Sequence, residues 1–242
     1  MRIKVILVAT VVAALAIGVV SSNAALQTST SVNVNVSKPG KPGSVRMVLV
    51  NNDTAGLVPQ RVSKITISSR VARWYSKGAG VCRSTVPTNA AGNNNAAPIS
   101  PACPRSSRIG KGKFTVNTGT VGQPIPADLG TISGDVTVYN YRPSGGKVAA
   151  LLFEIKSDIP VPNAHQYQLA QISKKGTLEA DVPNTSDLPP SVQQFLVGRT
   201  TSLNKLDVTL KSPKVKRGKR PLFTLKNNKK LDFLVTLDRD NG

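Results

Sequence analysis

One histidine and one serine–lysine spacing are the features of this chain that suggest nucleophilic catalysis. The histidine is His165, and the sequence contains no GxSxG segment that would supply the serine of a hydrolase. Ser202 and Lys205 have the SxxK spacing, which needs a helix to bring the two side chains together. They lie at the start of a predicted strand instead. We therefore interpret the spacing as chance and assign no catalytic residue.

Two glutamates are the next candidates, because paired carboxylates catalyse glycoside hydrolysis. Glu154 lies inside the apolar segment ALLFEI (150–155), and Glu179 lies in a second predicted strand. Solvent-facing strand positions are the simpler interpretation of two isolated acids. The alternative is an extracellular carbohydrate-active or carbohydrate-binding protein that uses Trp74, Glu154 and Glu179.

An aromatic and basic cluster surrounds the single tryptophan of the chain. Its members are Arg70, Arg73, Trp74, Tyr75 and Lys77. Aromatic rings flanked by cations stack on sugar rings or on nucleic-acid bases. Large aromatic side chains also dominate core burial, so we favour a core position for Trp74 and keep ligand stacking as the alternative.

Two cysteines, Cys82 and Cys103, are predicted to form a disulfide. An exported chain meets an oxidising environment, where two cysteines most simply pair. The bridge would close a segment rich in Asn, Ala, Gly and Pro (88–98) and contribute about 3 kcal/mol by restricting the unfolded chain. With both thiols consumed, the usual zinc ligands are missing, and we predict no metal and no cofactor.

The charge is strongly positive and unevenly distributed. The formal net charge is +20, and residues 25–127 contain thirteen Lys and Arg against one acid, Asp53. The segment 211–220 adds six cations and no acid, namely Lys211, Lys214, Lys216, Arg217, Lys219 and Arg220. Such a field attracts polyanions, so we predict an anionic cell-envelope polymer or another polyanion as the partner. The alternative is that the charge serves solubility alone.

Residues 1–24 are predicted to be a cleavable signal peptide. Arg2 and Lys4 form a basic start, residues 5–20 are apolar, and cleavage is expected after Ala24, where small residues occur. The apolar run of 16 residues is shorter than the roughly 20 that a membrane-spanning helix needs. We therefore predict a secreted, extracytoplasmic protein without an integral membrane span in its mature part. Because residues 1–24 hold no acid, losing Arg2 and Lys4 lowers the net charge from +20 to +18.

The rest of the chain is dominated by short alternating segments. Residues 31–37, SVNVNVS, place valine at every second position, which is typical of a half-buried strand. Turn sequences containing Gly, Pro or Asn separate such segments throughout the chain. We expect about ten strands, at residues 31–37, 45–50, 62–69 (with 71–75 as a continuation), 113–117, 129–141, 147–156, 167–172, 176–182, 203–210, 221–225 and 231–237.

Helix is expected at one place only, residues 188–197, where two prolines suit a first helical turn. A chain of many short strands with hardly any helix predicts an all-β fold, an antiparallel β-sandwich or a barrel-like variant of it. We interpret residues 25–242 as a single domain. A subdivision near 122–128, at the sequence GQPIPAD, is the alternative.

The region that begins at Cys82 resembles a group of uncharacterised exported β-sandwich proteins of high-GC Gram-positive soil bacteria. That group carries a cysteine, a variable stretch and then a CPxxSxIGxG-like motif that leads into a strand. The matching residues here are Cys103, Pro104, Ser107, Ile109, Gly110 and Gly112. The likeness extends over residues 44–242, but this chain has Arg220 and Pro221 where the group has a further Cys-Pro. The resemblance implies an exported β-sandwich and no particular activity.

These observations predict a non-enzymatic, basic, disulfide-bonded β-sandwich that is exported and associates with anionic polymers of the cell envelope.

Overall fold

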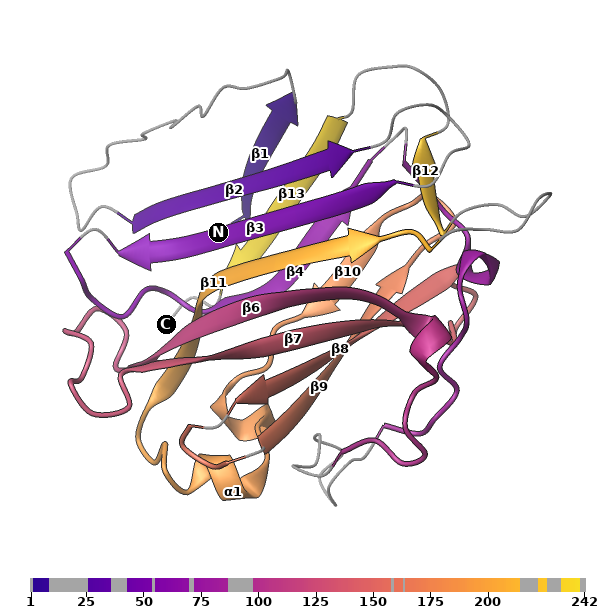
Figure 1. The fold of residues 1–242 in the computed structure, drawn as a ribbon. Helices are drawn as coiled ribbons and strands as arrows, with labels where there is room; N and C mark the ends of the chain where they lie inside the picture. Colours follow the sequence, from indigo (N-terminus) through magenta and orange to yellow (C-terminus); the bar gives the residue numbers. More distant parts are fainter. Residues whose placement is uncertain are drawn as a thin grey trace.

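The computed structural model describes residues 2–8, 26–35, 43–53, 55–69, 72–86, 98–157, 159–162, 164–213, 222–225 and 232–239. Within them the chain is almost entirely antiparallel β-structure (Figure 1). The strands are β1 (Arg2–Val8), β2 (Leu26–Asn35), β3 (Ser44–Asp53), β4 (Val62–Ser68), β5 (Ala72–Trp74), β6 (Arg108–Gly119), β7 (Thr131–Tyr141), β8 (Ala149–Ser157), β9 (Ala164–Ile172), β10 (Leu178–Asp181), β11 (Thr200–Lys211), β12 (Phe223–Leu225) and β13 (Asp232–Arg239).

Eleven of these strands form one sheet, in the order β1-β13-β4-β10-β9-β8-β7-β6-β11-β3-β2. Three pairs of consecutive strands form antiparallel hairpins, because β2 pairs with β3, β7 with β8, and β9 with β10. Strands β5 and β12 form a second sheet of two strands. The all-β fold class expected from the sequence is therefore confirmed.

The large sheet curls so that one of its faces, the inner face, packs against itself. Val45 of β3 and Leu210 of β11 belong to the same buried cluster as Ile67 of β4 and Val235 of β13. In β7 buried and more exposed residues alternate from Thr131 to Asn140, so the opposite, outer face is the more exposed of the two along most of this strand. The period-2 patterns in the sequence reflect this division, because successive side chains of a strand point to opposite faces.

Strand β6 is much longer than predicted, since it begins at Arg108 and not at residue 113. The sequence GKGK hides its start, because glycines occupy the inward positions where apolar side chains would have revealed a strand. A Cβ atom at Gly112 would lie 2.1 Å from the Asp207 carbonyl oxygen of β11. The glycine therefore permits the close approach of the neighbouring strand.

Three further elements differ from or refine the expectation. Residues 72–74 do not continue β4; they form β5 and pair with β12. The strand expected at 203–210 is part of β11, and its pairing with β6 has a register shift between Leu203 and Lys205. The helix expected in 188–197 is α1 (Pro190–Gln193), one turn long, with Pro189 as its N-cap and Pro190 as its first residue.

The N-terminus contributes β1 at one edge of the sheet, beside β13. The rest of the predicted signal peptide, residues 9–24, lies outside the described residues. Among the helices of the described part, none has the length and apolar character needed to cross a membrane. Residues 122–128 belong to the connection between β6 and β7, which are neighbours in the sheet.

Candidate functional site

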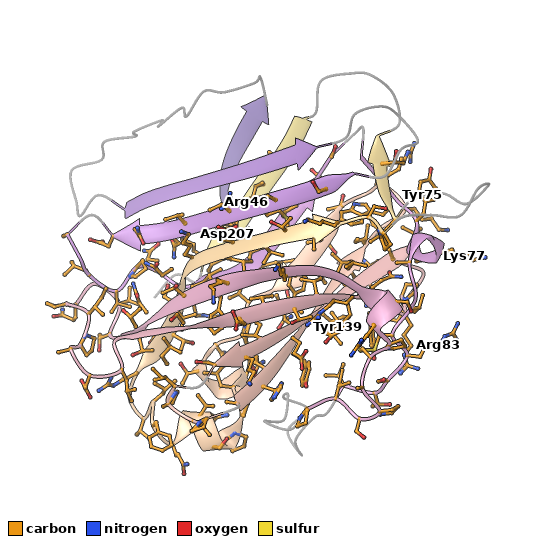
Figure 2. All side chains as sticks on the ribbon, in the orientation of Figure 1. Arg46, Tyr75, Lys77, Arg83, Tyr139 and Asp207 are labelled. Carbon is orange, nitrogen blue, oxygen red and sulfur yellow. A yellow bond between two sulfur atoms is a disulfide. The ribbon has the colours of Figure 1, made fainter. Side chains whose placement is uncertain are left out.

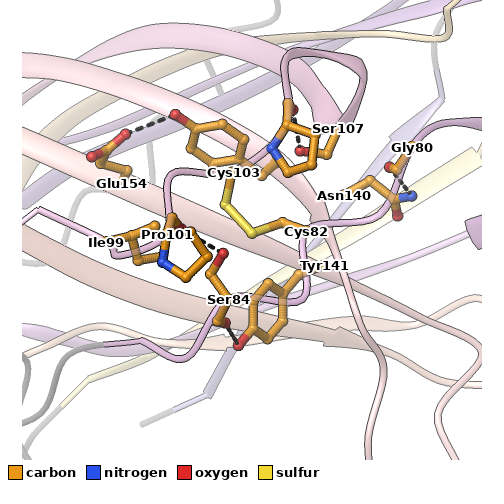
Figure 3. The surroundings of a disulfide bond; sticks show 12 residues. Gly80, Cys82, Ser84, Ile99, Pro101, Cys103, Ser107, Asn140, Tyr141 and Glu154 are labelled. Atoms are coloured by element: carbon orange, nitrogen blue, oxygen red, sulfur yellow. Dashed lines mark hydrogen bonds between the residues drawn. A yellow bond between two sulfur atoms is a disulfide. The ribbon is translucent and has the colours of Figure 1, made fainter.

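The predicted disulfide is present, and it joins the segment before β6 to the segment after β5. The Cα atoms of Cys82 and Cys103 are 5.0 Å apart. Figure 3 shows the disulfide between Cys82 and Cys103, with Tyr141 beside it. Cys82 is completely buried and packs on the outer face of the sheet with Tyr141, Leu152 and Tyr167. Its backbone also pairs with β7, since its N–H donates to the Asn140 carbonyl at 2.9 Å. The bridge thus fixes two loops on the outer face of the sheet.

Buried polar groups hold the same loops. The Asn140 side chain is fully buried, and its Nδ2 donates to the carbonyls of Ser76 (2.7 Å) and Gly80 (2.9 Å). The Tyr141 hydroxyl donates to the Ser84 carbonyl at 2.6 Å. These bonds satisfy carbonyls that a loop would otherwise leave unpaired away from water.

Five exposed cations surround the disulfide, and we name them the basic surface. They are Lys77, Arg83, Arg105, Arg108 and Arg142. Their segments are bonded to one another, because the Gly80 N–H donates to Ser106 and the Arg142 N–H donates to Cys82. Figure 2 shows Lys77 and Arg83 projecting from the same side of the molecule as Tyr75. The disulfide and these backbone bonds gather cations that are far apart in the sequence.

No carboxylate of the described residues forms an ion pair with the basic surface. The cause lies in the sequence, since the stretches 54–127 and 136–153, which supply all five cations, contain no Asp or Glu. The guanidinium of Arg142 lies 5.9 Å from the centre of the Tyr141 ring. The basic surface therefore holds like charges without internal neutralisation.

The acids elsewhere on the outer face are neutralised by neighbouring cations. Arg46 donates two hydrogen bonds to Asp207, at 2.9 and 2.6 Å, and these bonds lower the pKa of the Asp207 carboxyl (Figure 2). Lys113 donates to Asp135 at 2.7 Å and lowers the pKa of that carboxyl in the same way. These two carboxylates are therefore engaged by their own partners and do not neutralise the basic surface.

Glu154 lies on the outer face in a group of aromatic side chains. It accepts hydrogen bonds from the hydroxyls of Tyr139 (3.0 Å) and Tyr167 (3.4 Å), and its Oε1 lies 3.1 Å from His165 Nδ1. Burial, together with the Glu154 charge, raises the pKa of Tyr139 to about 12. His165 is thus a neighbour of a structural carboxylate, and no serine nucleophile is joined to it by a hydrogen bond in the described residues.

Glu154 and Glu179 do not form the carboxylate pair that a glycosidase needs. Glu179 is paired with Lys147 at 3.2 Å. In the register, Glu154 stands opposite Tyr167 and Glu179 opposite Gln171, four residues further along β9. Ordinary strand dimensions then separate the glutamates by about 16 Å, against roughly 5–9.5 Å in glycosidases.

Other predicted site residues are divided between the core and the surface. Trp74 packs against the inner cluster, as favoured from the sequence. Lys77 is exposed and belongs to the basic surface, whereas Arg70 lies outside the described residues. Ser202 is buried and donates to the Gln60 carbonyl, while Lys205 is exposed beyond the register shift, so the SxxK spacing forms no Ser–Lys pair.

Among the cations of the C-terminal basic segment, the structure describes Lys211, which is exposed at the end of β11. The other candidates for contact with a polyanion, Lys214, Lys216, Arg217, Lys219 and Arg220, lie outside the described residues. Among the residues that the structure covers, no three His, Cys, Asp or Glu side chains are grouped so that they could hold a metal ion.

A cavity of about 170 Å³ opens between the inner face of the sheet and the segment that carries α1. Strands β6, β7 and β8 provide one wall, and residues 188–196 cover it. Apolar side chains dominate the lining, among them Phe114, Val136, Phe153, Leu188, Val192 and Leu196. The sequence predicted the strands but could not reveal this cavity, because the wall and its cover are brought together by the curl of the sheet.

The cavity contains one unusual polar residue, Gln166 of β9. Its side chain is 7 % exposed, and neither its oxygen nor its nitrogen has a hydrogen-bond partner. It stands opposite Ile155 in the register, on the inner face and among the cavity residues. No motif in the sequence marked this position.

No protein-family model, curated protein or solved structure matches this chain.

Proposed function

We propose that this protein is exported and binds anionic polymers of the cell envelope through its basic surface. The observation that carries the proposal is the set of five exposed cations around the disulfide, which no carboxylate of the described residues neutralises. Closely spaced like charges repel one another, and a polyanion relieves that repulsion while releasing its own counterions. The basic segment 211–220 would extend the contact along the polymer.

Binding of this kind requires charge and spacing and no catalytic group. For flexible polyanions, each neutralised charge contributes about −0.7 to the slope of log K against log salt concentration. Five contacts therefore predict a slope of about −3.5. Engagement of the segment 211–220 would make the slope steeper.

The test is a salt titration of binding to poly(glycerol phosphate), with neutral dextran as the control polymer. In one variant the five cations of the basic surface are changed to Gln. The matched control changes five other cations to Gln, namely Lys111, Lys113, Lys174, Lys175 and Lys205, so both variants lose the same charge. We expect the first variant to lose most of its affinity and the control to retain it. Equal affinity of the two variants, or binding unaffected by salt, would refute the proposal.

A third variant changes the charged residues of segment 214–220 to Gln. Its slope of log K against log salt concentration is compared with that of the first variant. The comparison shows how many charge contacts the basic surface makes and how many the segment makes. If only this third variant loses affinity, the basic surface around the disulfide is not the binding site.

Export is tested separately by the intact mass of the protein recovered outside the cells. We expect a chain that begins at Ala25. Cleavage at that point removes β1 and leaves β13 at the edge of the sheet. A full-length mass on washed membranes would contradict this part of the proposal.

A further inference from the structure

We propose that the cavity under α1 is a binding site for a compact, uncharged apolar molecule that carries one carboxamide or lactam group, and that Gln166 recognises this group. The site lies on the inner face of the sheet, so it is distinct from the basic surface on the outer face. The two can therefore be tested independently.

The amide of Gln166 is the first reason. It is more than nine-tenths buried, it lines the cavity, and both of its polar atoms lack a partner. A buried amide without hydrogen bonds destabilises the folded state, and replacing it with an apolar group of similar shape removes that cost. Without a ligand, leucine at this position would make the folded protein more stable than glutamine does. A ligand that supplies the missing hydrogen bonds explains why glutamine is present.

The geometry of the amide selects the chemical class. Gln166 presents a donor and an acceptor side by side, and a carboxamide or lactam presents the complementary acceptor and donor. An ionised carboxylate is disfavoured, because burying it in an apolar cavity carries a large desolvation cost. Asp181, an exposed residue of the cavity lining, adds repulsion against any anion.

The cavity volume sets the size of the apolar part. A cavity of about 150 Å³ lined by aliphatic and aromatic side chains holds benzene, so 170 Å³ suits one six-membered ring or a branched group of similar size. Ile159, which is 51 % exposed, belongs to the cavity lining. Its side chain offers contact for a longer apolar substituent on the same ligand.

The experiment compares cyclohexanecarboxamide with 1-cyclohexylethanone, in which a methyl group replaces the amide nitrogen. Binding to the purified protein is followed by calorimetry. We expect the carboxamide to bind at least tenfold more tightly, because the ketone leaves one Gln166 hydrogen bond unmade. Cyclohexanecarboxylate at neutral pH is expected not to bind.

Two variants test the assignment. Gln166→Leu should bind the carboxamide and the ketone equally, and its melting temperature without ligand should rise by a few degrees, because an unpaired buried amide is removed. Gln168→Leu is the matched control, since Gln168 lies on the same strand and also lines the cavity. This control should keep the preference for the carboxamide.

Side-chain amide NMR signals of the unmutated protein provide a readout that does not depend on the variants. The Gln166 NH2 protons should shift with carboxamide and show contacts to its ring. No binding of either compound, equal binding of both, or an unchanged preference in Gln166→Leu would overturn the proposal. A Gln166 amide that stays bonded to a retained water in the presence of carboxamide would do the same.

Discussion

Breaking the disulfide between Cys82 and Cys103 should cost this fold a large share of its stability. The bridge spans a sequence separation of 21 residues. For a loop of this length, the entropy that the crosslink removes from the unfolded chain is about 11 cal/mol/K, which is about 3 kcal/mol at 25 °C. Single domains are stable by only about 5–15 kcal/mol, so the loss is large on that scale.

Two perturbations separate chain entropy from packing. Reduction of the natural protein breaks the crosslink but leaves both sulfurs in place. The variant Cys82→Ala/Cys103→Ala also removes a fully buried sulfur from contact with Tyr141 and Leu152. We expect the reduced protein to lose about 3 kcal/mol and the variant to lose about 1 kcal/mol more.

The assay is urea unfolding at neutral pH of the oxidised protein, the reduced protein and the variant. In thermal unfolding of the same samples, the melting temperature should fall by about 6–12 °C on reduction, given about 2–4 °C for each kcal/mol in a chain of this size. The m-value should rise on reduction, because the released unfolded chain exposes more surface. A stability difference below about 1 kcal/mol between the oxidised and reduced forms would refute the loop-entropy reasoning.

Three further predictions concern single side chains. Gly112→Ala places a Cβ 2.1 Å from a backbone oxygen of β11 and should lower the free energy of unfolding, measured in urea, by about 3 kcal/mol. The control Lys111→Ala, on the outer face, should change stability by less than about 0.5 kcal/mol. Equal effects of the two variants would contradict the close approach of β6 and β11. Asn140→Asp replaces the amide donor with a carboxylate oxygen that faces the Ser76 and Gly80 carbonyls, and it should lower the free energy of unfolding by about 3–5 kcal/mol at neutral pH. The loss of stability should be smaller in acid, where the carboxyl is protonated. A loss that does not depend on pH would argue against a buried charge. The pKa of Tyr139 is raised to about 12 from its usual value of about 10, so its contribution to stability is complete below pH 10 and is lost as the pH rises towards 12. Unfolding measured from pH 9 to 12 should therefore be less pH-dependent in Tyr139→Phe, and an unchanged dependence would exclude this tyrosine as the cause.

Local patterns predicted most of the sheet because each strand has one buried face. The apolar run at 45–50 and the alternation in 203–210 located β3 and β11. The patterns failed where backbone contact replaces side-chain burial, as at Gly110 and Gly112 in β6. They also failed to separate β5 from β4. A strand of three residues is too short to show an alternating pattern, and β5 is stabilised by its pairing with β12, which is distant in the sequence.

The candidate sites were less predictable than the fold. The chain's acid-free stretches indicated a cationic excess. Three sequence segments supply the basic surface, however, and only their mutual bonding brings these cations together. The glutamates resembled a possible pair until the register placed them about 16 Å apart. Gln166 could not be distinguished in the sequence from Gln168, two residues away on the same face.

The sequence by itself determined the all-β class, the pairing of the two cysteines, the short α-helix near 188–197 and the positive charge. These follow from local periodicity, from residue counts and from turn chemistry, which neighbours in the chain decide. The tertiary structure alone decided which cations are neutralised, where the unpaired ones gather, and that an apolar cavity contains an amide without partners. These properties depend on distances between residues far apart in the chain, and the curl and register of the sheet set those distances.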